Sequence, residues 1–129
     1  MAGLESIIRV KRHDLDEQRR ALGELEAERD ALAAQQTALD RTLAAEKEIA
    51  AGDPMTATTY AAYARRTAER RERLEAAKQA LDPRIEAARE AIFEAFQELK
   101  KYEQIRDQRQ AEAEEAERLA ENRAMDDIA

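Results

Sequence analysis

The first 50 residues of the chain carry apolar side chains at alternating steps of four and three residues. The positions of this seam are Leu4, Ile8, Lys11, Leu15, Gln18, Leu22, Leu25, Arg29, Leu32, Gln36, Leu39, Leu43, Glu46 and Ala50. Most of them are apolar, whereas the residues between them are mainly Glu, Asp, Arg, Gln and Ala. A repeat that averages 3.5 residues is typical of a coiled coil, because a globular helix carries a wider apolar stripe. The pattern therefore predicts one long helix over about residues 4–50.

The predicted helix ends at the only cluster of glycine and proline in the sequence, Gly52-Asp53-Pro54. Gly52 is the candidate for the left-handed position that ends many helices. Asp53 can cap the next helix, with Pro54 in its first turn and Thr56 as an alternative cap. We expect a turn over residues 51–55, and a connection this short makes the flanking helices antiparallel neighbours.

A second seam predicts a longer helix over about residues 56–125. Its positions are Tyr60, Tyr63, Thr67, Arg70, Leu74, Ala77, Leu81, Ile85, Ala88, Ile92, Ala95 or Phe96, Leu99 and Tyr102. The steps from Ala77 to Leu81 and from Leu81 to Ile85 are both four, which is a stutter that locally unwinds a left-handed supercoil. Pro83 lies inside the stutter and crowds the preceding turn of the helix, so we expect a kink in a continuous helix. The alternative is a fresh helix start at this proline.

The second predicted helix extends beyond the first. At about 1.5 Å per residue the two helices span about 70 Å and about 100 Å. Folding about Gly52 then places Leu4 opposite Tyr102, and an overhang over about residues 104–129 has no partner in its own chain. The seam in this overhang is reduced to Ile105, Ala113, Ala116, Leu119 and Arg123. A helix this polar is only marginally stable alone in water and can become ordered on binding.

Composition favours the same fold class: all-α, a single long antiparallel two-helix coiled-coil hairpin over residues 1–129. Charged residues make up 40% of the chain and aromatic residues only 4%, which is too few large side chains for a compact core. The net charge is −7, which disfavours nucleic acid or an anionic membrane as the main partner. The sequence has no apolar run long enough to span a bilayer and no signal-peptide pattern, so we expect a cytoplasmic protein.

No enzyme motif is found in the sequence. The three glycines, Gly3, Gly23 and Gly52, form no phosphate-binding loop. The single histidine, His13, is expected on a solvated helix face without convergent metal ligands. Cysteine is absent, which excludes disulfides and thiolate catalysis. We therefore predict a non-enzymatic protein with no cofactor and no metal.

Two further features of the sequence concern contacts with other proteins. The polar seam positions, such as Gln36, cost stability but can fix the register of the hairpin, or else leave a weakly packed seam for a partner to read. Tyr60 and Tyr63 stand next to an arginine-rich stretch over residues 65–73. They either close the tip of the hairpin or serve as exposed aromatic anchors for another protein.

Three stretches carry a resemblance to a known family. They are LESIIRVKRHDLDEQRRALGELEAERDAL near the N-terminus, YAAYARR after the turn, and AREAIFEAFQELKKYEQIRDQRQAEAEEAERLAENRAMDDIA at the C-terminus. Together they resemble the FliJ family, a soluble component of the bacterial flagellar type III export apparatus. The likeness covers nearly the whole chain, and the position of the turn and the unequal helices fit it. Pro83 has no counterpart in the family pattern, which puts a straight rod in doubt.

The resemblance implies a hairpin similar to the central stalk of rotary ATPases. It also implies a stalk or adaptor, monomeric or weakly dimeric, that links the hexameric export ATPase to the export-gate membrane protein and to export chaperones at the base of the flagellum. By this analogy the end with both termini enters the ATPase ring, and the surface near the turn meets the gate. The candidate ring contacts are Lys100, Lys101, Arg106 and Arg109, and the candidate gate contacts are Tyr60 and Tyr63. The alternative is a structural coiled-coil scaffold unrelated to secretion.

Overall fold

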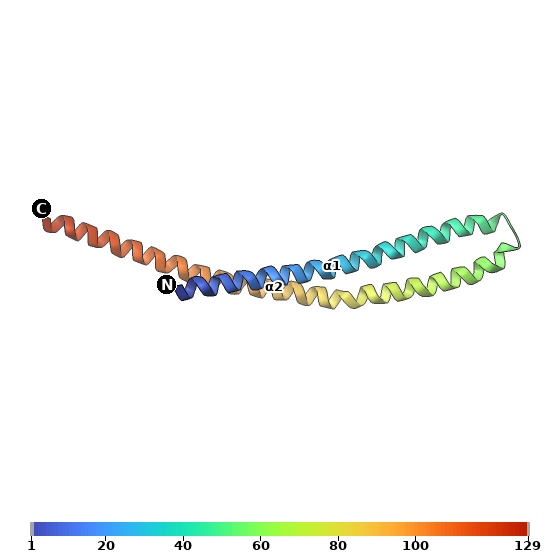
Figure 1. The fold of residues 1–129 in the computed structure, drawn as a ribbon, viewed down its shortest axis with the longest axis horizontal. Coiled ribbons are helices and arrows are strands. Elements are labelled where there is room, and N and C mark those ends of the chain that lie inside the picture. Colours follow the sequence, from blue (N-terminus) through green and yellow to red (C-terminus); the bar gives the residue numbers. More distant parts are fainter. Residues whose placement is uncertain (1, 129) are drawn as a thin grey trace. The chain divides into compact units, whose positions relative to one another are not determined.

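The computed structural model describes residues 2–128, which form two helices joined by a turn: α1 (Ala2–Ala51) and α2 (Thr56–Ile128) (Figure 1). No strand occurs in this described range. The helices have 50 and 73 residues, so the predicted all-α class with a longer second helix is confirmed. The chain divides into two units, each built from one segment of α1 packed against one segment of α2. We call Met1–Arg19 with Glu90–Ala129 the terminal unit, and Arg20–Arg89 the turn unit.

The seam predicted for α1 is the face that the helix buries. Ile8, Leu15 and Gln36 are buried, and of the other predicted seam positions only Glu46 is exposed. The burial follows the alternation of four and three residues because only that spacing keeps one face of a helix turned toward a helical neighbour. In the terminal unit, Ile8 and Leu15 form a core cluster with Leu99 of α2.

The seam of α2 in the turn unit corrects the prediction. Ala77 is exposed, whereas Lys78 is half-buried. The seam therefore steps by four from Leu74 to Lys78 and by three to Leu81, so no stutter occurs at Leu81, where it was predicted. With Arg71 as the position that reaches α1, the two consecutive steps of four run instead from Tyr63 to Thr67 and from Thr67 to Arg71. The alkyl stem of Lys78 covers the seam while its Nζ lies 3.0 Å from Oε1 of Gln36. A pattern that counts lysine as polar misses such a position.

Two further seam positions were left open or misplaced by the sequence pattern. Arg70 is exposed, and the neighbouring Arg71 is the residue that reaches α1, with its Nε 2.9 Å from Oδ1 of Asp40. In the terminal unit Ala95 is half-buried and Phe96 is exposed, so Ala95 holds the seam position.

The turn between the helices also differs from expectation. No described residue has a positive φ, so the predicted left-handed conformation of Gly52 is wrong. The last turn of α1 tightens instead: the N–H of Gly52 donates to the carbonyl of Ile49, and the N–H of Asp53 donates to that of Ala50, each at 3.3 Å. The Asp53 carboxylate then accepts a hydrogen bond from the Met55 N–H at 3.0 Å, which is the predicted capping role.

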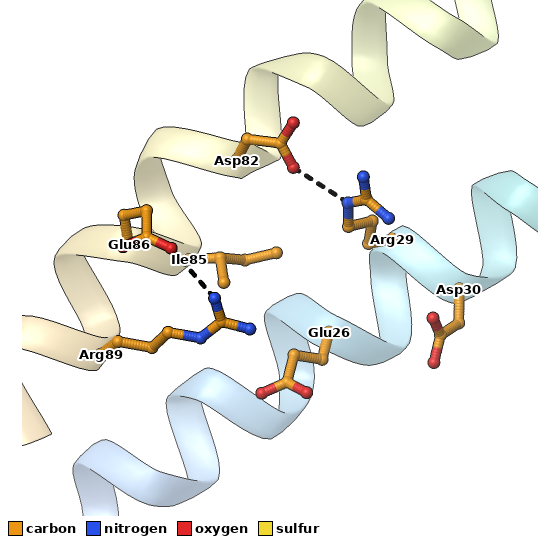
Figure 2. Close-up of a pocket in the computed structure, with 7 residues that line it drawn as sticks. All are labelled: Glu26, Arg29, Asp30, Asp82, Ile85, Glu86 and Arg89. Carbon is orange, nitrogen blue, oxygen red and sulfur yellow. Dashed lines mark hydrogen bonds and ion pairs between the residues drawn. The ribbon is translucent and has the colours of Figure 1, made fainter.

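α2 is continuous through Pro83, so the alternative of a fresh helix start at this residue is wrong. Nearby, polar pairs join the two helices of the turn unit. Figure 2 shows Arg29 of α1 reaching toward Asp82 of α2, with Nε 2.9 Å from Oδ1, and the side chain of Ile85 pointing toward α1. Each such exposed pair contributes at most about 1 kcal/mol, so its main effect is on register.

The apolar cluster of the terminal unit generates the first prediction. Leu15 is only 4% exposed, so Leu15→Ala should lower the free energy of unfolding by about 2–3 kcal/mol, the low end for a buried leucine. Val10 lies on the same helix but is 57% exposed. Val10→Ala should therefore change the free energy of unfolding by less than about 0.5 kcal/mol. Urea unfolding followed by circular dichroism measures both values. Equal losses for the two variants would show that the buried face is assigned to the wrong residues.

Candidate partner-binding surfaces

The turn unit has a mostly apolar hollow of about 300 Å³ next to the turn. Tyr60 and Tyr63 are half-buried and line it, one helical turn apart. The other lining residues are Glu46, Ile49, Ala50, Thr56, Thr59 and Arg66. The two tyrosines are thus neither fully packed in a core nor fully exposed. Aromatic side chains at the edge of an apolar hollow are suited to holding an apolar side chain of another protein.

Two apolar side chains near this hollow are more exposed than the tyrosines. Ile49 is 61% exposed at the end of α1, and Met55 is 87% exposed in the turn. The sequence pattern did not single them out as partner contacts. Ile49 lies one residue before the seam position Ala50, and this offset is the signal in the sequence that could have identified it as an outward-facing residue.

The four predicted cationic residues of the terminal unit have different surroundings. Lys100 and Lys101 are exposed, with their Nζ atoms 5.4 Å from the Phe96 ring centre and 5.9 Å from the Tyr102 ring centre respectively. Such cation–π contacts hold the ammonium groups on the surface, and Lys100 also lies 3.8 Å from a carboxylate oxygen of Glu103. Arg109 is likewise exposed. These three cations remain accessible to a partner.

Arg106 is the only one of the four that is half-buried. Its side chain is 27% exposed, and its guanidinium lies 4.0 Å from a carboxylate oxygen of Glu5 and 3.1 Å from one of Asp107. It lines a hollow with Arg109, beside the start of α1. The Arg106 guanidinium therefore lies near carboxylates of both helices, at the level where α1 begins.

Beyond Arg106 the surface of α2 changes. Every residue from Asp107 to Ile128 is exposed, and in Figure 1 the orange and red end of α2 continues past the N-terminal end of α1. The segment extends over about 33 Å at the usual rise per residue. It contains eight carboxylates and three arginines. We call residues 107–128 the overhang.

A partly buried polar cluster crosses the seam of the turn unit. Gln36 is 6% exposed, and its Nε2 donates to Oε2 of Glu75 at 2.8 Å. The Nζ of Lys78 lies 3.3 Å from the same carboxylate. The hydrogen bond from Gln36, followed by that from Lys78, lowers the pKa of Glu75 below its ordinary value. The cluster fits only one alignment of α1 with α2, so it favours the register role of the polar seam positions.

The larger hollow shown in Figure 2 lies between the helices of the turn unit and measures about 370 Å³. Four of the charged groups that line it form two ion pairs: Arg29 with Asp82, and Arg89 with Glu86 at 3.0 Å. An acid–base site needs carboxyl groups that are held out of water together, and these face solvent. Across residues 2–128 no group of three or more metal-binding side chains converges, and no helix is long and apolar enough to cross a membrane.

Sequence reasoning missed one further surface. Phe93 is 60% exposed and Phe96 41% exposed, three residues apart on one side of α2 in the terminal unit. Phe93 falls off the regular seam, which was a partial signal. The pattern left Ala95 and Phe96 as alternatives, and only the position of α1 separates them.

The comparisons with a family model and with curated proteins point to the same family. The family model for the flagellar FliJ protein matches residues 1–129. Two curated relatives, each a flagellar FliJ protein from a strain of Caulobacter vibrioides (NA1000 / CB15N, and ATCC 19089 / CIP 103742 / CB 15), are 31% identical over 103 residues. The aligned region covers 80% of this chain and 74% of each relative. No solved structure was found to match the chain.

The Glu75 cluster predicts a pH-dependent contribution to stability. Because the pKa of Glu75 is lowered on folding, its stabilising effect should be complete above its unfolded pKa and lost as pH falls through the folded pKa. Glu75→Gln should therefore lower the melting temperature by a constant amount above about pH 5, and the difference should shrink below about pH 4. Glu72→Gln, at an exposed position on the same helix, is the matched control. A Glu75→Gln difference that is independent of pH would contradict this role of the cluster.

Proposed function

The chain belongs to the FliJ family and is a component of the flagellar protein export apparatus, and we propose that it acts there as a non-enzymatic stalk or adaptor. In this proposal it works in the cytoplasm at the base of the flagellum. It links the hexameric export ATPase to the export-gate membrane protein and to export chaperones.

The exposed overhang is the observation that carries the proposal. From Asp107 to Ile128 no side chain of α2 is buried within the chain, although the helix continues. An isolated helix in water gains little from its own hydrogen bonds, so most of its stability must come from packing against another surface. A ring-shaped ATPase with a central opening offers such a surface to a single protruding helix.

The cations at the base of the overhang give the contact its chemistry. Lys100, Lys101 and Arg109 are exposed and can meet carboxylates of the ATPase. Such a contact would accelerate association and weaken as salt rises. Arg106 plays a different part in this proposal, because its contact with Glu5 fixes the point at which α2 leaves α1.

The hollow beside the turn supports the second contact. Tyr60 and Tyr63 line a mostly apolar space, and Met55 is almost fully exposed next to it. We assign this surface to the export gate, because apolar and aromatic anchors of this kind dominate the affinity of protein interfaces. The two contacts then use different units of the chain, as an adaptor requires.

Truncation after Arg106 tests the ATPase contact directly. It removes the overhang but leaves the Arg106–Glu5 contact and every buried seam residue in place. The truncated chain should keep its cooperative thermal unfolding and lose stimulation of the export ATPase, measured as phosphate release. If it stimulates the ATPase as well as the full chain, the overhang is not the coupling element, and the proposed ATPase contact is wrong.

A charge-reversal series separates specific contact from general electrostatics. Lys100→Glu, Lys101→Glu and Arg109→Glu together should weaken ATPase stimulation by at least about tenfold at low salt. The matched control reverses three exposed arginines of the turn unit, Arg65, Arg73 and Arg84, and so produces the same change of net charge. Equal losses in the two triple variants would contradict a contact at the base of the overhang.

A further inference from the structure

α2 carries a second heptad stripe in the terminal unit, beside the seam that α1 covers. Its positions are Phe93, Phe96, Lys100, Glu103, Asp107, Glu114, Arg118, Glu121, Met125 and Ile128. Within each half of this set the steps alternate between three and four residues, so the side chains lie along one side of the helix. All of them are exposed except Glu103, which is half-buried.

Exposed apolar side chains gather at the two ends of this stripe. Phe93 and Phe96 form one end, and Met125 and Ile128, at 69% and 87% exposure, form the other. Among the described residues of the terminal unit, α2 has only one other large apolar side chain with comparable exposure, Leu119. Scattered exposed apolar residues are ordinary on a protein surface, but their concentration on one stripe marks an interface.

Charged residues stand next to each apolar end. Lys100 lies over Phe96 at 5.4 Å and 3.8 Å from Glu103, which also accepts a hydrogen bond from Arg12 of α1 at 3.2 Å. The Glu103 side chain is only 18% exposed, whereas Lys100 and Arg12 are each 53% exposed. The aromatic end therefore presents positive charge to its surroundings. The aliphatic end carries Glu121, within an overhang that has an excess of carboxylates.

The stripe is complementary to itself. We propose that a second copy of this chain covers it, with the two α2 helices antiparallel and a two-fold axis between Gln110 and Ala111. This alignment pairs Phe93 with Ile128, Phe96 with Met125, Lys100 with Glu121, Glu103 with Arg118, and Asp107 with Glu114. Each pair occurs twice because the interface is isologous. Two of the five pairs are apolar and two join opposite charges.

The remaining pair, Asp107 with Glu114, places like charges near the axis. Within each chain Arg106 lies 3.1 Å from Asp107, and the amide of Gln110 donates to Glu114 at 3.5 Å, so both carboxylates have a partner of their own. The repulsion makes the dimer weaker than the apolar ends alone would allow. It also leaves the association reversible.

Only this alignment places the apolar ends of the two copies against each other and also pairs Lys100 with Glu121 and Glu103 with Arg118. Sliding one copy by a heptad places Phe96 opposite Arg118 and brings Asp107 against the same residue of the second copy. Both phenylalanines then face charged groups, and Glu103 loses its arginine partner, although Lys100 still meets a carboxylate, that of Glu114. The register of the dimer is therefore specified by the sequence of the stripe, as charged flanking positions specify coiled-coil partners.

The dimer is independent of the proposed function in export, and it uses no other protein. It covers the overhang of each copy with the α2 helix of the other. A chain that binds an ATPase through its overhang would have to leave the dimer first.

Charge exchange tests the pairing in solution by analytical ultracentrifugation. Lys100→Glu and Glu121→Lys should each weaken dimerisation of the full chain by at least about tenfold, because each places two pairs of like charges in the interface. The double variant Lys100→Glu/Glu121→Lys should recover dimerisation, and an equimolar mixture of the two single variants should form heterodimers. A wild-type chain that stays monomeric at all concentrations, or single variants that dimerise as well as wild type, would overturn the proposal.

Cysteine cross-linking tests the register. The chain has no cysteine, and positions 96 and 125 lie about 44 Å apart along one helix, so a disulfide between them must join two chains. Phe96→Cys/Met125→Cys should form covalent dimers under mild oxidation. Phe96→Cys/Leu119→Cys is the matched control, because Leu119 lies off the stripe. Equal yields from the two variants would contradict the proposed alignment.

Discussion

The length of the seam that α1 and α2 share determines most of the properties of this protein. α1 can cover only as much of α2 as its own 50 residues reach, and α2 has 73. The buried side chains are consequently limited to positions up to the level of Arg106, where a contact with Glu5 marks the start of α1. Beyond this level every described residue of α2 is exposed, although Gln110 and Ala113 still line a hollow with Leu4 at the start of α1. The proposed binding to a ring and the proposed dimer are two ways of covering the same unpartnered helix.

The seam also contains several polar side chains. They determine how α1 and α2 are aligned more than they stabilise the hairpin. Arg29 with Asp82, Gln36 with Glu75 and Lys78, and Asp40 with Arg71 connect α1 to α2 at successive levels of the turn unit. A heptad pattern alone permits the helices to slip by seven residues, because the apolar positions would still meet. The specific polar pairs would no longer meet after such a slip. By fixing the register they also fix which residues of α2 remain beyond α1, and hence which side chains a partner can reach.

Much of this arrangement could be predicted from the sequence, because the spacing of apolar residues follows directly from the geometry of packed helices. The fold class is correct, and so is the seam of α1 except at Glu46, which is exposed. The errors have different physical causes, and the first is a side chain with two functions. Lys78 lies in the seam through its stem and binds Gln36 through its ammonium, so a polar–apolar pattern selected Ala77. Gly52 was assigned a left-handed conformation that the tightened end of α1 does not need. The exposed pair Phe93 and Phe96 required knowledge of where α1 lies.

Amide hydrogen exchange on the dilute, monomeric chain tests the central claim, that one limited seam divides α2 into a packed part and an unpacked part. Amides whose side chains face the seam, around Leu15, Leu81 and Leu99, should exchange slowly because they open only with the packed helices. Amides from Asp107 to Ile128 should exchange many times faster, with a boundary near Arg106. Uniform protection along the whole of α2, or a boundary far from Arg106, would contradict the account.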